Sequence, residues 1–279
     1  MTDFLELLFI LGSLLAFLVF ARSVFGWVAR AEGYSLTFET TVKDNPAVGI
    51  RFGLFLLAST IPFLNLLEPS GAGLKEDFNV LAFYGLVSVV LLIVAREVND
   101  RLILYKFSND AEVIGKRNTS VAVVEGASYL ATAFIVSGAF SNVDAGIGAA
   151  LIWFLVGQCV LVVLDNIYSI AVPGLQEALA SQDLACALSL GGFLLAGGMA
   201  LGAAISGESF GWTQDAIDVA YFLGVWFLLI IVVHFVMNRL FLPGTSLRKE
   251  LLNDRNVGAG LIEAVLFISV TLFYIRVRG

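Results

Sequence analysis

Charged residues are scarce in this sequence, since Asp, Glu, Lys and Arg together make up only 14% of its 279 residues. Soluble domains carry about 25% charged residues, because charged side chains cover much of a water-exposed surface. A soluble or disordered chain is therefore excluded. The net charge of −7 argues against nucleic acid as a partner. With 59% hydrophobic residues, the composition is typical of a polytopic membrane protein.

Residues that bind metals or carry redox chemistry are also rare. The chain has one histidine, His234, and two cysteines, Cys159 and Cys186, which both fall within apolar runs. We expect the cysteines to act as small apolar packing residues, and we expect no metal, haem or other cofactor. Motifs of nucleotide-binding, hydrolase and zinc-protease sites are missing as well, so the sequence predicts no catalytic residue and no enzyme.

Long apolar runs dominate what is present. A helix needs about 20 apolar residues to span a bilayer, and eight runs qualify: 4–28, 45–66, 78–99, 118–140, 145–168, 183–206, 216–238 and 256–275. The runs are continuous rather than alternating, which excludes a β-barrel and predicts an all-α membrane bundle of eight transmembrane helices. Acidic Asp3 and Glu6 near the start argue for a retained first helix instead of a cleaved signal peptide.

Basic residues collect in the connections after the first, third and seventh runs. They are Arg22, Arg30, Lys43, Arg101, Lys106, Lys116, Arg117, Arg239, Arg248, Lys249 and Arg255. The opposite face is mainly acidic, with Asp3, Glu6, Glu68, Glu76, Asp77, Asp144, Glu208, Asp215 and Asp218; Lys75, Arg276 and Arg278 are its exceptions. The positive-inside rule predicts cytoplasmic basic connections and both termini on the outer, periplasmic side.

Four of the apolar runs open with the same pattern, a capping residue followed by small residues two and four places later. The capping residues are Asn45, Asn118, Asp183 and Asn256. Asn and Asp are good helix N-caps, and the small residues allow close helix approach. The spacing from Asn45 to Asp183, the repeat offset, is the same as the spacing from Asn118 to Asn256. We therefore expect two tandem four-helix repeats, 1–140 and 141–279, in parallel orientation because each contains an even number of spans.

A short polar stretch precedes each of these capped runs. In the last one, Ser246 and Glu250 stand beside the apolar pair Leu251 and Leu252. This pattern predicts a brief helix at the membrane interface.

The repeated phrase Asn-x-Ala/Ser/Gly-x-Ala/Gly at the start of a glycine-rich span resembles the YjfL-like bacterial inner-membrane family, domain of unknown function 350. The resemblance covers essentially the whole chain, which is similar to two family-sized units in tandem. Pro46 and Asp183 depart from the phrase, although both keep a good helix start. The resemblance implies a bacterial cytoplasmic (inner) membrane and no established activity.

Two carboxylates lie inside predicted spans, at equivalent places. Glu125 and Glu263 each stand seven residues after their capping asparagine, which is about 10 Å into the helix. Arg96 and His234 end the preceding spans and are separated by the same repeat offset. The spacing predicts two equivalent pairs, Arg96 with Glu125 and His234 with Glu263, and Arg51 is placed to join the first.

Two interpretations of these pairs stay open. Ionisable residues inside a membrane often mark an ion, proton or substrate path, and a His–Glu pair can change protonation near neutral pH. A buried ion pair can instead fix helix register. The Gly198 and Gly202 pair predicts close helix packing, with pore lining as the alternative. For Asp165 we expect a turn at the interface.

Three classes of function remain. We favour a channel or transporter for an ion or small molecule that uses the intramembrane carboxylates. The alternative is a non-catalytic scaffold that binds a partner protein or lipid, and a lipid-modifying enzyme ranks third. The expected partners are membrane lipid and either a second copy of the chain or another membrane protein.

Overall fold

The computed structural model describes residues 2–65, 74–141, 146–207 and 209–278. In this part of the chain every regular element is helical, and eight helices are long and apolar enough to cross a membrane. They are α1 (Thr2–Ala31), α3 (Pro46–Asn65), α4 (Leu74–Val98), α5 (Thr119–Ala139), α6 (Gly146–Ala171), α8 (Leu184–Ile205), α9 (Trp212–Val236) and α11 (Val257–Arg278). The prediction of an eight-helix, all-α membrane bundle is confirmed.

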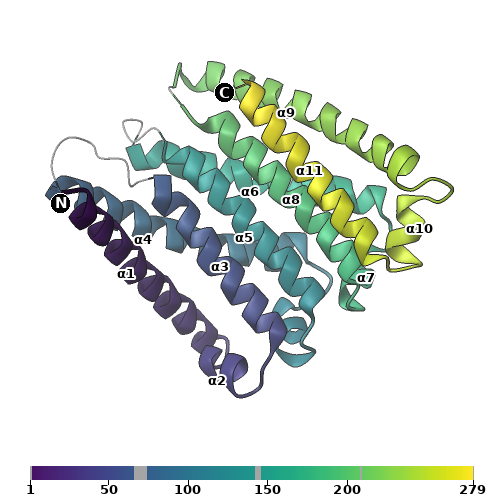
Figure 1. Ribbon diagram of the computed structural model, residues 1–279, viewed down its shortest axis with the longest axis horizontal. Coiled ribbons are helices and arrows are strands. Elements are labelled where there is room, and N and C mark those ends of the chain that lie inside the picture. The colour runs from purple at the N-terminus through teal and green to yellow at the C-terminus, as the bar shows by residue number, and fades with distance from the viewer. Residues whose placement is uncertain (1, 66–73, 142–145, 208, 279) are drawn as a thin grey trace.

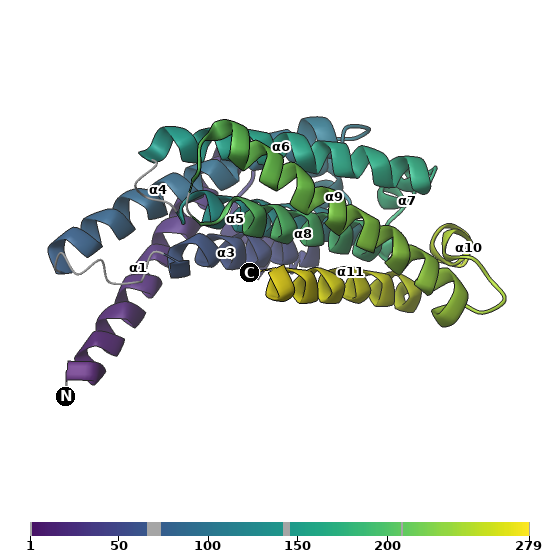
Figure 2. The same ribbon diagram turned by 90° about the horizontal axis from the view of Figure 1, so that it is seen from above.

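The helices form two layers. Helices α3, α5, α8 and α11 lie side by side in one layer, and α4, α6 and α9 form the second layer behind them (Figures 1 and 2). Each second-layer helix packs in the groove between two first-layer neighbours, as α6 does between α5 and α8. Helix α1 packs against α3 at one end of the row. The middle helices α5 and α8 are consequently the most buried spans.

Short helical segments precede the four first-layer helices. They are α2 (Leu36–Thr41), η2 (Ala111–Gly115), α7 (Leu175–Ala180) and α10 (Leu247–Leu252). The brief helix expected after Ser246 is α10, and the Ser246 hydroxyl caps it by accepting from the Lys249 amide. Helices α2, α7 and α10 lie at the end of the bundle away from both chain termini (Figure 1).

The acidic face expected at the terminal end is described only in part. Asp218 is exposed there and Asp215 is partly buried, both near the start of α9. Arg276 and Arg278, the basic exceptions, are exposed in the last turn of α11. The remaining residues expected on that face fall outside the described side chains: Asp3, Glu6, Glu68, Lys75, Glu76, Asp77, Asp144 and Glu208.

Helices α4 and α9 run further than the hydropathy pattern suggests. They continue into the π-helical turns η1 (Asn99–Ile103) and η4 (Met237–Phe241). Each turn contains an exposed arginine, Arg101 or Arg239. Charge ends an apolar run in the sequence without ending the helix, because these long side chains extend into water.

The four capping residues explain why the first-layer helices begin where they do. The Asn118 side-chain oxygen accepts from the Ser120 and Val121 amides at 3.0 and 3.2 Å. Asn45 and Asp183 accept from two amides in the same way, and Asn256 accepts from the Ala259 amide. The residue before each cap has a left-handed backbone, with φ of 49° at Asp44, 54° at Arg117, 62° at Gln182 and 47° at Arg255. The same turn therefore recurs in all four helix pairs.

A glutamate six residues before the cap completes this turn in three of the four units. The side-chain nitrogens of Asn45, Asn118 and Asn256 donate to Glu39, Glu112 and Glu250 at 3.2, 3.0 and 2.8 Å, respectively. In the third unit the cap is an aspartate, which cannot donate, and its Glu177 bonds Lys106 instead, at 2.6 Å. That bond lowers the pKa of Glu177. The fixed spacing was a signal in the sequence that the prediction missed.

Candidate functional site

The first acid-centred cluster surrounds Glu125 on α5. Arg51 on α3 contacts one carboxylate oxygen through Nε at 2.7 Å, and Arg96 on α4 contacts the other at 3.5 Å. The Tyr129 hydroxyl donates to the carboxylate at 2.8 Å. All four side chains are buried. The structure thus brings together the predicted Arg96–Glu125 pair and Arg51.

Two further carboxylates close this cluster toward the capped end of the helices. Asp110, just before η2, accepts from Arg51 at 2.6 Å and from Arg96 at 2.8 Å, and Glu32, just after α1, contacts Arg96 at 2.7 Å. Burial raises the pKa of Glu32, and this effect outweighs the nearby guanidinium. Both acids are partly exposed, so the cluster reaches the surface through them.

The second cluster surrounds Glu263 on α11. His234 Nδ1 on α9 lies 3.1 Å from one carboxylate oxygen, and the Tyr168 hydroxyl donates to the other at 3.1 Å. The Ser189 hydroxyl contacts the same oxygen as Tyr168. Glu263 is fully buried, whereas the His234 side chain is 47% exposed. The predicted His234–Glu263 pair is therefore also in contact.

The two clusters are equivalent in position and different in charge. Ser189 stands one repeat offset after Arg51, just as His234 stands one repeat offset after Arg96. Both clusters therefore form between the two first-layer helices of one repeat, α3 with α5 and α8 with α11. Two arginines surround the first carboxylate, while hydroxyls and one imidazole surround the second.

Sequence reasoning missed five members of these clusters: Glu32, Asp110, Tyr129, Tyr168 and Ser189. Ser189 had a signal, because it is the repeat equivalent of Arg51. Tyr168 had none, because its equivalent in the first repeat is Arg30. In the sequence alone, a tyrosine within an apolar run is interpreted as a packing residue, because the sequence does not show which helix its hydroxyl contacts.

A small cavity lies beside the second cluster. Its volume is about 180 Å³, and its lining includes Tyr168 and His234 together with apolar side chains such as Phe193 and Phe267. Two residues that contact the Glu263 carboxylate, Tyr168 and His234, therefore also line a cavity between α6, α8, α9 and α11.

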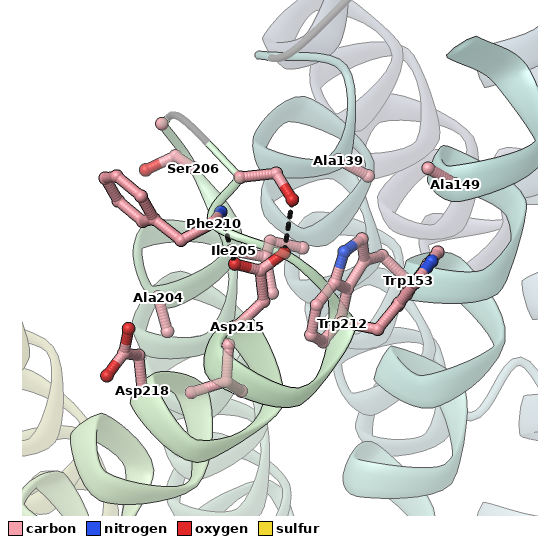
Figure 3. A pocket seen from close by; sticks show the side chains of 13 residues that line it. Ala139, Ala149, Trp153, Ala204, Ile205, Ser206, Phe210, Trp212, Asp215 and Asp218 are labelled. Carbon is pink, nitrogen blue, oxygen red and sulfur yellow. Dashed lines mark hydrogen bonds between the residues drawn. The ribbon is translucent and has the colours of Figure 1, made fainter. Parts of the chain in front are cut away.

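A separate pocket lies at the opposite end of the helices, near the start of α9 (Figure 3). Its volume is about 330 Å³. Asp215 is held there by the Ser209 hydroxyl at 2.5 Å and the Phe210 amide at 2.9 Å. Trp153 and Trp212 stack beside it with ring centroids 6.0 Å apart. None of the predicted site residues lines this pocket.

The glycine pair lies where α8 packs closely against α5. A Cβ on Gly198 would lie 2.4 Å from the Ala131 Cα, and one on Gly202 would lie 2.3 Å from the Phe134 carbonyl oxygen. These glycines therefore let α8 approach the α5 backbone.

Two other expectations are wrong. Asp165 lies inside α6 and is fully buried, with no hydrogen-bond partner among the described residues, because α6 continues to Ala171 and forms no turn there. Cys159 is exposed on α6, so only Cys186 packs in the core. An apolar run does not reveal which of its faces the neighbouring helices cover.

Comparisons with known proteins agree with the repeat. No curated protein and no solved structure matches this chain. The model of a family described as Domain of Unknown Function (DUF350) matches residues 1–140 and again residues 142–275. Two family units in tandem thus account for nearly the whole chain, and the expected resemblance is confirmed. The chain belongs to the DUF350 family.

Proposed function

We propose that this chain is a channel or transporter for an ion or small molecule, and that Glu263 is its membrane-embedded binding group. One observation carries the proposal. The Glu263 carboxylate is fully buried within a span, and its ionic partner among the described residues is an imidazole rather than a permanent cation. A buried carboxylate that is not permanently neutralised suits a proton or a small cation.

The surroundings of His234 support this assignment. Histidine exchanges a proton near neutral pH, and His234 is half-exposed while its Nδ1 contacts Glu263. His234 and Tyr168 are also among the residues that line the cavity beside the cluster. His234 is therefore the group that would pass a proton to Glu263.

We assign the structural interpretation to the first cluster. Arginine keeps its charge at every physiological pH, and Glu125 lies between Arg51 and Arg96. A carboxylate held by two permanent cations has little freedom to bind a further cation. Its proposed role is to fix the register of α3, α4 and α5.

The location that fits this function is a bacterial cytoplasmic membrane, with the basic connections inside and both termini on the periplasmic side. Exposed apolar side chains on the outer helices, such as Val19 on α1 and Leu228 on α9, support contact with lipid. The proposal includes no enzymatic step.

Flux through reconstituted vesicles tests the proposal. Proteoliposomes containing a pH-sensitive dye, or loaded with one cation at a time, are driven by a potassium–valinomycin potential. We expect flux with the native chain and loss of flux with Glu263→Gln. His234→Arg places a permanent cation where Arg96 stands in the first cluster, so we expect it to abolish flux while the chain stays folded. The matched control is Asp218→Asn, at an exposed carboxylate on α9.

Two outcomes would contradict the proposal. Native flux through Glu263→Gln would remove the carboxylate from the path. The absence of flux of protons, alkali cations and small anions through the folded native chain would favour the scaffold alternative.

A further inference from the structure

We infer that copies of this chain pack head to tail in the membrane, with α11 of one copy against α3 of the next. The inference rests on the repeated interface inside the chain and does not depend on the proposed function.

The interface between neighbouring first-layer helices recurs three times in one register. The residue nine places after a cap meets the residue eight places after the next cap, in the pairs Leu54 with Gly126, Ala127 with Gly191 and Gly192 with Ala264. Nearer the caps, a Cβ on Gly260 would lie 2.2 Å from the Ala185 carbonyl oxygen, so position four of one unit contacts position two of the unit before it.

Helix α3 has no first-layer neighbour on one side. The positions of α3 that would contact such a neighbour have no described residue packed against them. Gly49 and Gly53 stand four and eight residues after the first cap, and a Cβ on either would meet nothing within 4 Å. The same face carries Leu57, which is 53% exposed. In the other three units the equivalent of Gly53 is covered by the unit before it.

Helix α11 presents the opposite half of the same interface. Gly258 and Val265 stand two and nine residues after the last cap. A Cβ on Gly258 would meet only the Asn256 side-chain oxygen of its own cap within 4 Å among the described residues, and Val265 is 51% exposed. In the proposed contact, Val265 would face Gly53 of the next copy, as Leu54 faces Gly126 within the chain.

The capping asparagines indicate the same junction. Asn45 and Asn118 are buried, and each donates to a carbonyl of the following unit, Val113 at 3.1 Å and Leu179 at 2.8 Å. Asn256, the last cap, is exposed and bonds Glu250 in its own unit. A following copy would supply the missing carbonyl from α2, the segment equivalent to η2 and α7.

A second copy fits this junction better than another partner does, because the two bare faces are the two halves of one interface. All four units are parallel, and copies inserted in the same direction into a bilayer are parallel too. The alternation of polar and apolar junctions also continues. The helix positions that form an acid cluster within each repeat carry apolar residues at the central junction between the repeats, namely Val124 and Leu190. At the two free ends these positions are again apolar, Ile262 and Phe52, so the contact between copies would resemble the central junction.

Two features show where this contact would differ from the internal ones. Thr60 and Leu64 stand where Gly198 and Gly202 stand at the central junction, so the outer halves of the helices would lie further apart. Within the chain, the residue just before a cap bonds the residue two places before the preceding cap, as Gln182 bonds the Lys116 carbonyl and Arg255 bonds Ser181. Between copies the equivalent pair is Asp44 and Asp254, so two acidic side chains would lie side by side. The contact is heterologous, so repeated copies would form a closed ring or an open row.

Cysteine cross-linking in native membranes tests the inference. The background carries Cys159→Ala and Cys186→Ala, and Gly53→Cys and Val265→Cys are placed on separate, differently tagged chains that are expressed together. We expect an oxidant to join the two tags into one dimer. The internal equivalent of this pair, Ala127→Cys with Gly191→Cys on one chain, reports whether the geometry permits a disulfide.

Two outcomes of the cross-linking would overturn the inference. One is no intermolecular bond between Gly53→Cys and Val265→Cys while the internal pair does form. The other is a Gly53→Cys dimer with itself, which would mean a two-fold contact instead of a head-to-tail one.

The oligomeric state in mild detergent supplies a second readout. Gly53→Trp fills the bare face of α3, and Gly224→Trp is its control, at an exposed glycine of α9 that also has no neighbour within 4 Å. We expect native mass spectrometry to find oligomers for the native chain and the control, and monomers for Gly53→Trp. A monomeric native chain, or unchanged oligomers with Gly53→Trp, would contradict the inference.

Discussion

The two intramembrane carboxylates allow a matched comparison, because Glu125 and Glu263 occupy the same place in two repeats. Replacing Glu125 by Gln leaves the guanidiniums of Arg51 and Arg96 buried, and their remaining ion-pair partners among the described residues are the partly exposed Asp110 and Glu32. Breaking a buried ion pair by removing one partner costs about 3–5 kcal/mol. We expect Glu125→Gln to lower the free energy of unfolding by that amount.

The same substitution at Glu263 has a smaller expected cost. The amide can keep hydrogen bonds to the Ser189 and Tyr168 hydroxyls, and the half-exposed His234 can lose its proton. Weakening hydrogen bonds of this kind costs about 1 kcal/mol. The two variants should thus differ by at least about 2 kcal/mol, although the helix depth and the chemical change are the same.

Unfolding in mixed micelles, followed by the fluorescence of the four tryptophans, measures this difference. A rescue identifies its cause. Adding Arg51→Ser and Arg96→His to Glu125→Gln removes the stranded cations and introduces the serine and histidine of the second cluster, so most of the lost stability should return. Equal costs at Glu125 and Glu263, or no rescue, would refute the explanation based on unpaired guanidiniums.

Three further predictions use the same unfolding measurement. Asn118→Ala removes a buried cap and leaves the Leu179 carbonyl without its hydrogen bond, so we expect the free energy of unfolding to fall by about 2–3 kcal/mol. For Asn256→Ala, at an exposed cap, we expect a fall of about 1 kcal/mol. Equal losses would contradict the hydrogen bond between units. Gly202→Ala should cost about 1–3 kcal/mol because its Cβ meets the backbone of α5, whereas Gly224→Ala, in open space, should stabilise the helix by up to about 1 kcal/mol. Burial raises the pKa of Glu32, so the native chain should lose stability as pH rises through that pKa. Glu32→Gln does not titrate, so its stability relative to the native chain should be higher at pH 8 than at pH 4. A stability difference between the two chains that does not change with pH would contradict the raised pKa.

The eight spans and the tandem repeat were predictable because both depend on properties that are local in sequence. An apolar run long enough to cross a bilayer must satisfy its own backbone hydrogen bonds, so it forms a helix whatever its neighbours are. The cap pattern at Asn45 and its three equivalents marks the start of a helix for the same local reason.

The members of the clusters were predictable only where equivalent positions of the two repeats both carried ionisable residues. The Arg96–Glu125 and His234–Glu263 pairs share one offset, so each supported the other. Asp110 and Tyr168 come from segments that reach the clusters only after the two layers have packed together. The burial of Asp165 was missed for the same reason, since which face of α6 is covered depends on helices distant in the sequence.

The difference between the two repeats bears on how one fold could combine stability with the permeation that we propose. Both repeats use the same turn, the same cap and the same carboxylate position, so the backbone does not decide which cluster is rigid. The exchange of Arg51 for Ser189 and of Arg96 for His234 removes both permanent cations, and the equivalent of Asp110 is Arg248, which is exposed. The second carboxylate thereby lacks fixed counter-ions and the acidic cover, and two of its partners, Tyr168 and His234, line a cavity. Under the proposed function, the first repeat would hold the bundle in register while the second changes its charge, because α5 and α8 join them through an apolar interface that no titration alters.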